Sequence, residues 1–128
     1  MDTDVFSFMF GGDFRAARYR PHLQGCVAAL SFQTIAELLQ GAFQNNWGER
    51  RVGRLRQAIG GHVTIPFDME MVEHFARLRA ARRKGGREVG VADAWIAATA
   101  LWADCPVLTH NRRDFDGIEG LQVITEAD

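Results

Sequence analysis

The sequence has few of the side chains that build zinc sites, disulfides or redox centres. Its 128 residues include two cysteines, Cys26 and Cys105, and neither has a second cysteine or a histidine at zinc-ligand spacing. Both stand among apolar neighbours, so we expect buried free thiols. The four histidines are scattered and form no His-x-x-x-His pair. Together these absences argue against zinc and redox chemistry.

Long hydrophobic runs and common nucleotide motifs are also missing. No apolar stretch approaches the roughly 20 residues needed to cross a bilayer, and the acidic start lacks a basic signal-peptide region. We therefore expect a cytoplasmic protein with no membrane partner. There is no Gly-x-x-x-x-Gly-Lys-Ser/Thr loop, no Gly-x-Gly-x-x-Gly and no Gly-x-Ser-x-Gly, which argues against P-loop, dinucleotide and serine-hydrolase chemistry.

Lysine is nearly absent, because Lys84 is the single lysine among 15 basic residues and the rest are arginines. Most arginines gather in residues 15–20, 50–56 and 77–87, although the net charge of the chain is only −1. A planar guanidinium group suits phosphate oxygens, so one cluster could contact a nucleic acid backbone. Solvated helix faces explain the same pattern, and the sequence leaves both interpretations open.

Strand-like and helix-like segments alternate along the chain, with no repeat and no linker. Short apolar runs predict strands, and apolar residues at helical spacing predict amphipathic helices. The alternation favours one α/β domain over residues 1–128, with helices around a mainly parallel central sheet. The expected strands are 1–5 (shortened, because only Met1 precedes Asp2), 26–30, 63–67, 106–109 and 121–125, and the expected helices are 6–10, 13–20 (stopped by Pro21), one from Ser31 or Gln33 to about 42, 47–59, 69–84 and 91–103.

Several acids follow predicted strands directly. Asp2 and Asp4 end the first strand, where their alternation points both side chains to one side. Asn111 and Asp114 follow the strand 106–109. Because ligands of parallel sheets gather at the carboxyl ends of the strands, we expect these side chains to meet at one edge. A frayed acidic terminus and ordinary turn-forming residues would give the same pattern.

Two more acids lie on predicted helices. Asp93 shares a helix face with Ile96, Ala97 and Ala100, and an inward carboxylate is costly unless something compensates it. It is interpreted either as a site carboxylate or as a helix N-cap. Glu37 lies opposite the apolar stripe of its helix, so periodicity alone predicts that it is exposed to solvent.

Taken together, the acids point to a hard cation. Three or four oxygen ligands without histidine or cysteine favour Mg²⁺ or Mn²⁺. Such a cation can lower the pKa of a water molecule and neutralise charge on a phosphodiester in the transition state. The pattern therefore indicates metal-dependent chemistry on a phosphate.

Four segments, in this order, resemble a known family. They are Asp2-Thr3-Asp4-Val5 and the stretches from Ser31 to Gly41, from Gly86 to Ala98 and from Leu108 to Phe115. Over nearly its whole length the chain resembles a PIN-domain ribonuclease of the VapC toxin type. The resemblance implies a PIN-like α/β/α sandwich with a parallel sheet and a cluster of acids that binds Mg²⁺ or Mn²⁺.

The resemblance also implies roles for individual residues. Asp2, Glu37 and Asp93 match the three principal acids of the family, and we take Asp114 as the fourth catalytic and metal-binding acid. Around them, the matched positions near the metal or on the Glu37 helix are Asp4, Ser7, Thr34, Thr109 and Asn111.

The implied function is that of a Mg²⁺- or Mn²⁺-dependent endoribonuclease, the toxin of a toxin–antitoxin pair. Arg112 and Arg113, beside Asp114, are candidates to hold the RNA backbone. Such toxins usually form homodimers and are inhibited by a small antitoxin protein whose C-terminal segment lies across the active-site groove. The alternatives are a non-catalytic RNA- or antitoxin-binding module on the same fold, a phosphoesterase for small phosphates or DNA, and an unrelated α/β domain whose acids are caps and turns.

Overall fold

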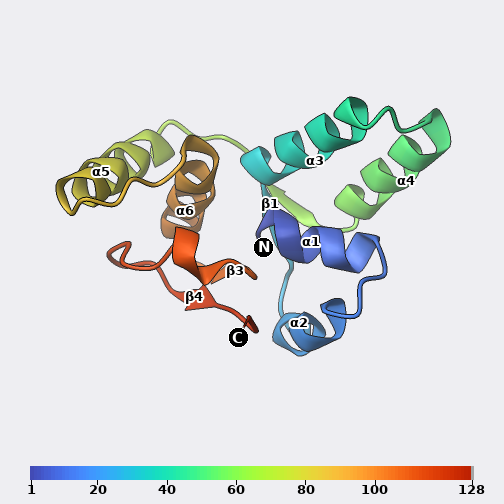
Figure 1. The fold of residues 1–128 in the computed structure, drawn as a ribbon, viewed down its shortest axis with the longest axis horizontal. Coiled ribbons are helices and arrows are strands. Elements are labelled where there is room, and N and C mark those ends of the chain that lie inside the picture. Colours follow the sequence, from blue (N-terminus) through green and yellow to red (C-terminus); the bar gives the residue numbers. More distant parts are fainter. Residues whose placement is uncertain (128) are drawn as a thin grey trace.

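The computed structural model describes residues 1–127, and Figure 1 shows helices on both sides of a set of short strands. From residue 29 onward, strands are separated by one or two helical segments, as the sequence predicts. In chain order the elements are α1 (Thr3–Phe10), α2 (Ala16–Leu23), β1 (Ala29–Ser31), α3 (Phe32–Gln44), α4 (Glu49–Gly60), β2 (Val63–Ile65), α5 (Met71–Lys84), α6 (Val91–Ala103), β3 (Val107–Leu108), the 3₁₀ turn η1 (Arg112–Asp114) and β4 (Val123–Ile124).

The strands form two parallel pairs, β1 with β2 and β3 with β4. Residues 1 and 2 join the pairs. The Met1 ammonium donates to the carbonyl of Ala29 at 2.8 Å, and the Asp2 N–H donates to the carbonyl of Leu108 at 2.8 Å. Met1 thus bonds to β1 on one side and Asp2 bonds to β3 on the other, as in a strand that lies between two neighbouring strands. The predicted parallel sheet is confirmed, with its centre reduced to these two residues.

The first strand ends earlier than predicted. Because α1 begins at Thr3, the predicted strand over residues 1–5 is wrong beyond Asp2. The Asp2 side chain accepts a hydrogen bond from the Thr3 N–H at 2.7 Å, and this cap starts the helix. Asp4 therefore lies in the first turn of α1 and does not alternate with Asp2 along a strand.

Three predictions for residues 13–30 and 105 also need correction. Pro21 lies inside α2 and does not stop it; the helix ends at Leu23, so the proline removes backbone bonding only near its C-terminal end. Strand β1 begins at Ala29, which leaves Cys26 in the preceding loop, exposed and not buried. Cys105 is only partly buried.

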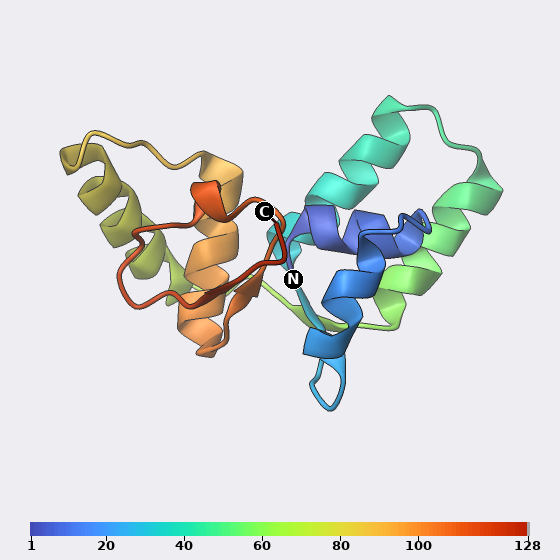
Figure 2. The ribbon, with the colours of Figure 1, turned by 60° about the horizontal axis from the view of Figure 1, so that its bottom comes forward.

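The apolar core divides into clusters on the two sides of the N-terminus. In one, α5 and α6 pack together and over β3; in another, α1, α3 and α4 pack around Leu30 of β1. Figure 2 shows these two halves with the N-terminus between them. A third cluster around Val5, Tyr19 and Leu108 joins α1 and α2 to β3. The helices thus cover both faces of the strands, and the junction of the two halves is at residues 1 and 2.

Helix α6 is the most deeply buried helix of the described chain. Six of its residues are buried, including the run from Ile96 to Ala100, because it is apolar on nearly every face. It starts after Gly90 and ends at Asp104, which adopts the left-handed conformation with φ 53°. Within residues 1–127 no helix has the length and apolarity needed to cross a bilayer.

Leu30→Ala should lower the free energy of unfolding by about 2–5 kcal/mol, because Leu30 is fully buried and its truncation leaves a cavity. Urea denaturation followed by circular dichroism measures the change. Met69→Ala is the control, since Met69 is 72% exposed and should change stability by no more than about 0.5 kcal/mol. Equal midpoints for the two variants would contradict this account of the core.

Candidate active site

Asp2 is fixed where the two strand pairs meet. It is 7% exposed; its Oδ1 accepts the Thr3 N–H at 2.7 Å, and its Oδ2 accepts the Thr109 hydroxyl at 2.8 Å. Burial raises the pKa of Asp2 above its ordinary value, and these hydrogen bonds offset part of the rise. The carboxyl group is therefore held in place by groups that favour its charge, in surroundings that disfavour it.

Asp93 lies in the first turn of α6. The N-cap of this helix is Gly90 and no side chain caps it, so the interpretation of Asp93 as an N-cap is wrong. Burial raises the pKa of Asp93 to about 7, and the charges of Asp114, Asp2 and Glu37 add to the rise. Without a cation nearby, a carboxyl group with this pKa keeps its proton on about half of the molecules at neutral pH.

Asp114 is brought in by the η1 turn. Its Oδ2 accepts a hydrogen bond from Asn111 Nδ2 at 2.6 Å, and its carboxyl group shares a hydrogen bond with that of Asp93. Two carboxyl groups can share a hydrogen bond only when one of them is protonated. Asn111 itself is exposed, and the contact it makes orients Asp114.

Glu37 approaches from α3. It is half-buried, and its buried Oε1 has no hydrogen-bond partner among the described residues. The prediction that it is exposed is wrong, because α1 packs against α3 and places Thr3 and Ser7 beside Glu37 in one pocket. Burial is the first cause that raises the pKa of Glu37, and the charges of Asp2 and Asp4 act in the same direction.

Thr109 connects the acids to the end of β3. It is fully buried; its hydroxyl donates to Asp2, and its Oγ1 accepts the Asn111 N–H at 3.0 Å. Asp4 accepts the His110 N–H at 3.1 Å on the same segment. Burial, followed by the charge of Asp2, raises the pKa of Asp4 to about 6. The segment after β3 thus holds two acids of the N-terminal segment in place.

Ser7 and Thr34, two other residues matched by the resemblance, do not hold an acid in place as Thr109 does. Ser7 is exposed and lines the pocket that contains Glu37. Thr34 is fully buried, and its N–H donates to the hydroxyl of Ser31 at 3.1 Å in the cap that starts α3. The hydrogen bonds of Thr34 therefore position the helix that carries Glu37 and do not reach an acid.

The donor set fits a hard divalent cation. The charges that act most strongly on Asp93 and Glu37 come from other acids, so a cation would relieve their repulsion. All the donors are oxygens, which Mg²⁺ and Mn²⁺ prefer. In residues 1–127, however, no three acidic, histidine or cysteine side chains converge closely enough to make a finished metal site.

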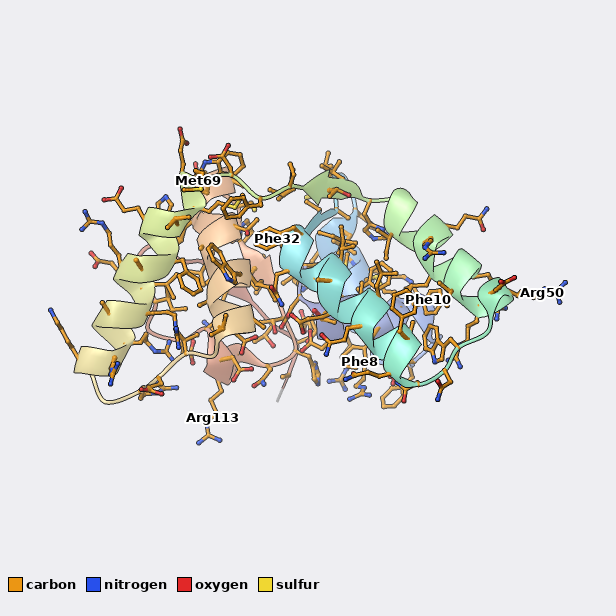
Figure 3. All side chains as sticks on the ribbon, turned by 90° about the horizontal axis from the view of Figure 1, so that it is seen from above. Phe8, Phe10, Phe32, Arg50, Met69 and Arg113 are labelled. Atoms are coloured by element: carbon orange, nitrogen blue, oxygen red, sulfur yellow. The ribbon has the colours of Figure 1, made fainter. Side chains whose placement is uncertain are left out.

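Arg112 and Arg113 lie on the η1 turn together with Asp114. Arg112 Nε donates to Asp116 at 3.0 Å, which holds its guanidinium group against the turn. Arg113 is exposed and extends away from the body of the protein (Figure 3). Both residues therefore adjoin Asp114 along the chain, and the Arg113 side chain extends into solvent.

Sequence reasoning missed Tyr19 and His110. The Tyr19 hydroxyl forms a hydrogen bond with His110 Nδ1 and accepts the Glu126 N–H at 3.1 Å, while Tyr19 itself is fully buried. These contacts fix the segment whose backbone holds Asp4. The available signal was weak: Tyr19 is the single tyrosine of the chain and stands in an otherwise polar helix.

Comparison with known proteins gives the family. The PIN domain family matches residues 1–121. Ribonuclease VapC1 of Haemophilus influenzae is 33% identical over 125 residues, covering 95% of this chain and 92% of that protein. The tRNA(fMet)-specific endonuclease VapC of Shigella flexneri is 26% identical over 122 residues, covering 95% and 92%. Among solved structures, DNA-bound VapBC from Salmonella typhimurium superimposes with a TM-score of 0.85 at 26% identity, over 97% of this chain and 94% of that one.

The chain therefore belongs to the PIN-domain family, among the VapC ribonucleases. The predicted α/β architecture and the predicted family are confirmed. The roles of the individual acids stay predictions, which rest on the geometry described above.

In the absence of metal, the acids should make the protein less stable as the pH rises. The pKa of Asp93 is about 7 in the folded protein and 3.8 ordinarily, so the folded state binds this proton more tightly. The resulting stabilisation is present below about pH 4 and is lost between about pH 4 and pH 7. Asp93→Asn, which removes the charge, should flatten the decline and raise Tm by several degrees at about pH 8.

Thermal melts in EDTA across this range measure the effect as the difference between variant and wild type. Asp104→Asn is the matched control, because Asp104 lies at the other end of α6 and asparagine tolerates its left-handed backbone. The control should follow the wild-type curve. If Asp93→Asn follows it too, the charge of Asp93 does not oppose folding.

Proposed function

We propose that this chain is a metal-dependent endoribonuclease and the toxin of a toxin–antitoxin pair. The observation that supports this most is the electrostatic coupling of Asp2, Glu37, Asp93 and Asp114, whose charges act on one another from four separate segments of the chain. Membership among the VapC ribonucleases supplies the reaction class, hydrolysis of RNA phosphodiester bonds.

In this proposal the four acids hold Mg²⁺ or Mn²⁺. The cation, when bound, would lower the pKa of a water molecule and offset negative charge on the scissile phosphate. The protein contributes orientation: Thr109 fixes Asp2, Asn111 fixes Asp114, and the first turn of α6 presents Asp93. Ligands held by hydrogen bonds need not reorganise during the reaction, which favours catalysis.

The proposed protein partners are a small antitoxin and a second copy of this chain. A solved toxin–antitoxin complex from Klebsiella pneumoniae superimposes on this chain with a TM-score of 0.74 at 27% identity. We propose that the antitoxin of this chain covers the acids. The exposed Phe14 and Phe43 are candidates for the homodimer contact. We further propose a single PIN-like domain over residues 1–128 that acts in the cytoplasm.

A non-catalytic module that binds RNA or antitoxin is the second candidate. The observation that favours it is that both carboxylate oxygens of Asp2 already accept hydrogen bonds within the protein, from the Thr3 N–H and the Thr109 hydroxyl. Titration with Mn²⁺ separates the two candidates, because a binding module need not retain a metal site. RNA binding without Mn²⁺ binding and without cleavage would support the module.

Asp93→Asn should reduce RNA cleavage at least about 100-fold, because it keeps the shape of the side chain and removes charge at the proposed metal site. The assay uses purified protein with Mg²⁺ or Mn²⁺, with EDTA as the blank, and compares RNA, DNA and a small phosphate ester. Asp104→Asn, the same change at the other end of α6, should cleave at the wild-type rate. Full activity of Asp93→Asn would remove this residue from the site.

Arg112→Gln with Arg113→Gln should weaken RNA binding and reduce the slope of log K against log salt by about 1 to 2. The slope falls because binding releases fewer counterions when phosphate contacts are lost. Fluorescence anisotropy in EDTA measures binding without cleavage. Arg50→Gln is the control, since Arg50 lies at the opposite end of the molecule from Arg113 (Figure 3). An unchanged slope in the double variant would place both arginines outside the RNA interface.

A further inference from the structure

Arg82 of α5 is a buried cation without an acidic partner. It is 8% exposed, its Nη1 donates to the carbonyl of Asp116, and its Nε is buried with no hydrogen-bond partner. Within residues 1–127 no carboxylate forms an ion pair with it. A guanidinium group that is taken out of water without an anion is destabilising. This position therefore favours the binding of an anion.

The same side chain lines a pocket of about 460 Å³ between α5 and the segment 116–119. Cavities of this volume are typical of small-molecule sites. The pocket combines basic and apolar walls, and the lining side chains that matter most are Arg77, Arg87, Leu78, Leu101 and Ile118.

Two acids also line the pocket, and neither blocks an anion at Arg82. The carboxylate of Asp116 accepts a hydrogen bond from Arg112 at 3.0 Å, so its charge is already paired. Glu119 is exposed to solvent, where water screens its charge. The buried part of the pocket is therefore positive.

Of the three arginines that line the pocket, Arg82 and Arg87 have donors that a ligand can use. Arg77 is paired with Glu73 at 2.8 Å on the exposed face of α5. Arg87 is exposed and has no carboxylate partner among the described residues; its Nη2 donates to the carbonyl of Arg113 at 3.2 Å. Arg82 and Arg87 thus face the pocket with donors to spare, because each guanidinium group carries five N–H donors.

The pocket adjoins the candidate active site. Asp116 lies two residues after Asp114, at most about 7 Å along the chain. The bond from Arg87 to the Arg113 carbonyl ties the pocket wall directly to the η1 turn. An RNA strand bound at the candidate active site would therefore reach this pocket within a few nucleotides.

We propose that this pocket binds a nucleotide, with its phosphate on Arg82 and Arg87 and its nucleoside against the apolar wall of Leu78, Leu101 and Ile118. A phosphate accepts several charge-assisted hydrogen bonds at once and so matches two guanidinium groups. The apolar wall can pack against a ribose and a base, whereas a short acidic side chain has little apolar surface to place there. The nucleotide is either one unit of an RNA strand or a free mononucleotide; the first source rests on the proposed function and the second does not.

The test is calorimetric titration of the full chain in EDTA with AMP, inorganic phosphate, a short single-stranded RNA and a glutamate-rich peptide. Arg82→Leu and Arg87→Gln should each weaken AMP or RNA binding at least about tenfold, and Arg50→Gln should not change it. Arg82→Leu should keep or raise Tm, because it replaces an unpaired buried charge with an apolar side chain. Arg87→Gln decides the matter if Arg82→Leu does not fold, since Arg87 is exposed.

Two outcomes support the proposal and identify the source. Binding of RNA more tightly than AMP identifies a unit of the RNA strand, and equal binding identifies a free nucleotide. The proposal is overturned if no phosphate compound binds, or if only the peptide binds. It is also overturned if the Arg82 and Arg87 variants keep the wild-type affinity, because Arg82 would then serve only to hold the Asp116 carbonyl. Cleavage is not needed, so failure of the nuclease assay leaves this result independent.

Discussion

Mutual repulsion among four carboxyl groups is the constraint on which the site depends. Three of the acids are positioned by the packing of the elements that carry them. Asp93 lies on the buried helix α6, Glu37 lies where α3 contacts α1, and Asp114 lies on the η1 turn. Apolar burial, together with hydrogen bonds such as those from Thr109 to Asp2 and from Asn111 to Asp114, must therefore hold like charges together. A proton on Asp93, whose pKa is raised to about 7, relieves part of this repulsion, and a divalent cation would relieve more.

The sequence predicts most elements of the fold because periodicity records burial, and it fails where one helix packs on two sides. The apolar stripe of α3 correctly indicates its packing against α4, but it says nothing of α1, which covers the side of Glu37. Asp93 was accessible to prediction because it stands on an inward face. Asp4 was not correctly placed, because the alternation of Asp2 and Asp4 looks like a strand although the helix α1 begins at Thr3.

The arginine cluster of residues 77–87 shows why charge runs are hard to interpret from sequence. Arg77 is an exposed side chain paired with Glu73, in agreement with a solvated helix face. Arg82, five residues later, is buried and lines a pocket with basic and apolar walls. Helical spacing places Arg82 one turn after Leu78, on the inward face of α5. The charge of Arg82 is therefore less screened by water than the charges of the exposed arginines in this cluster.

The candidate site lies where the two strand pairs of the fold meet. Asp2 bonds to β3 through its backbone N–H and to Thr109 through its side chain, while Met1 beside it bonds to β1. Separation of the two strand pairs would displace Asp2 from the other acids. A cation held by Asp2 from one half and Asp93 from the other would oppose that separation, because binding to the folded state alone stabilises it. Metal binding and the integrity of the sheet are therefore linked through one residue.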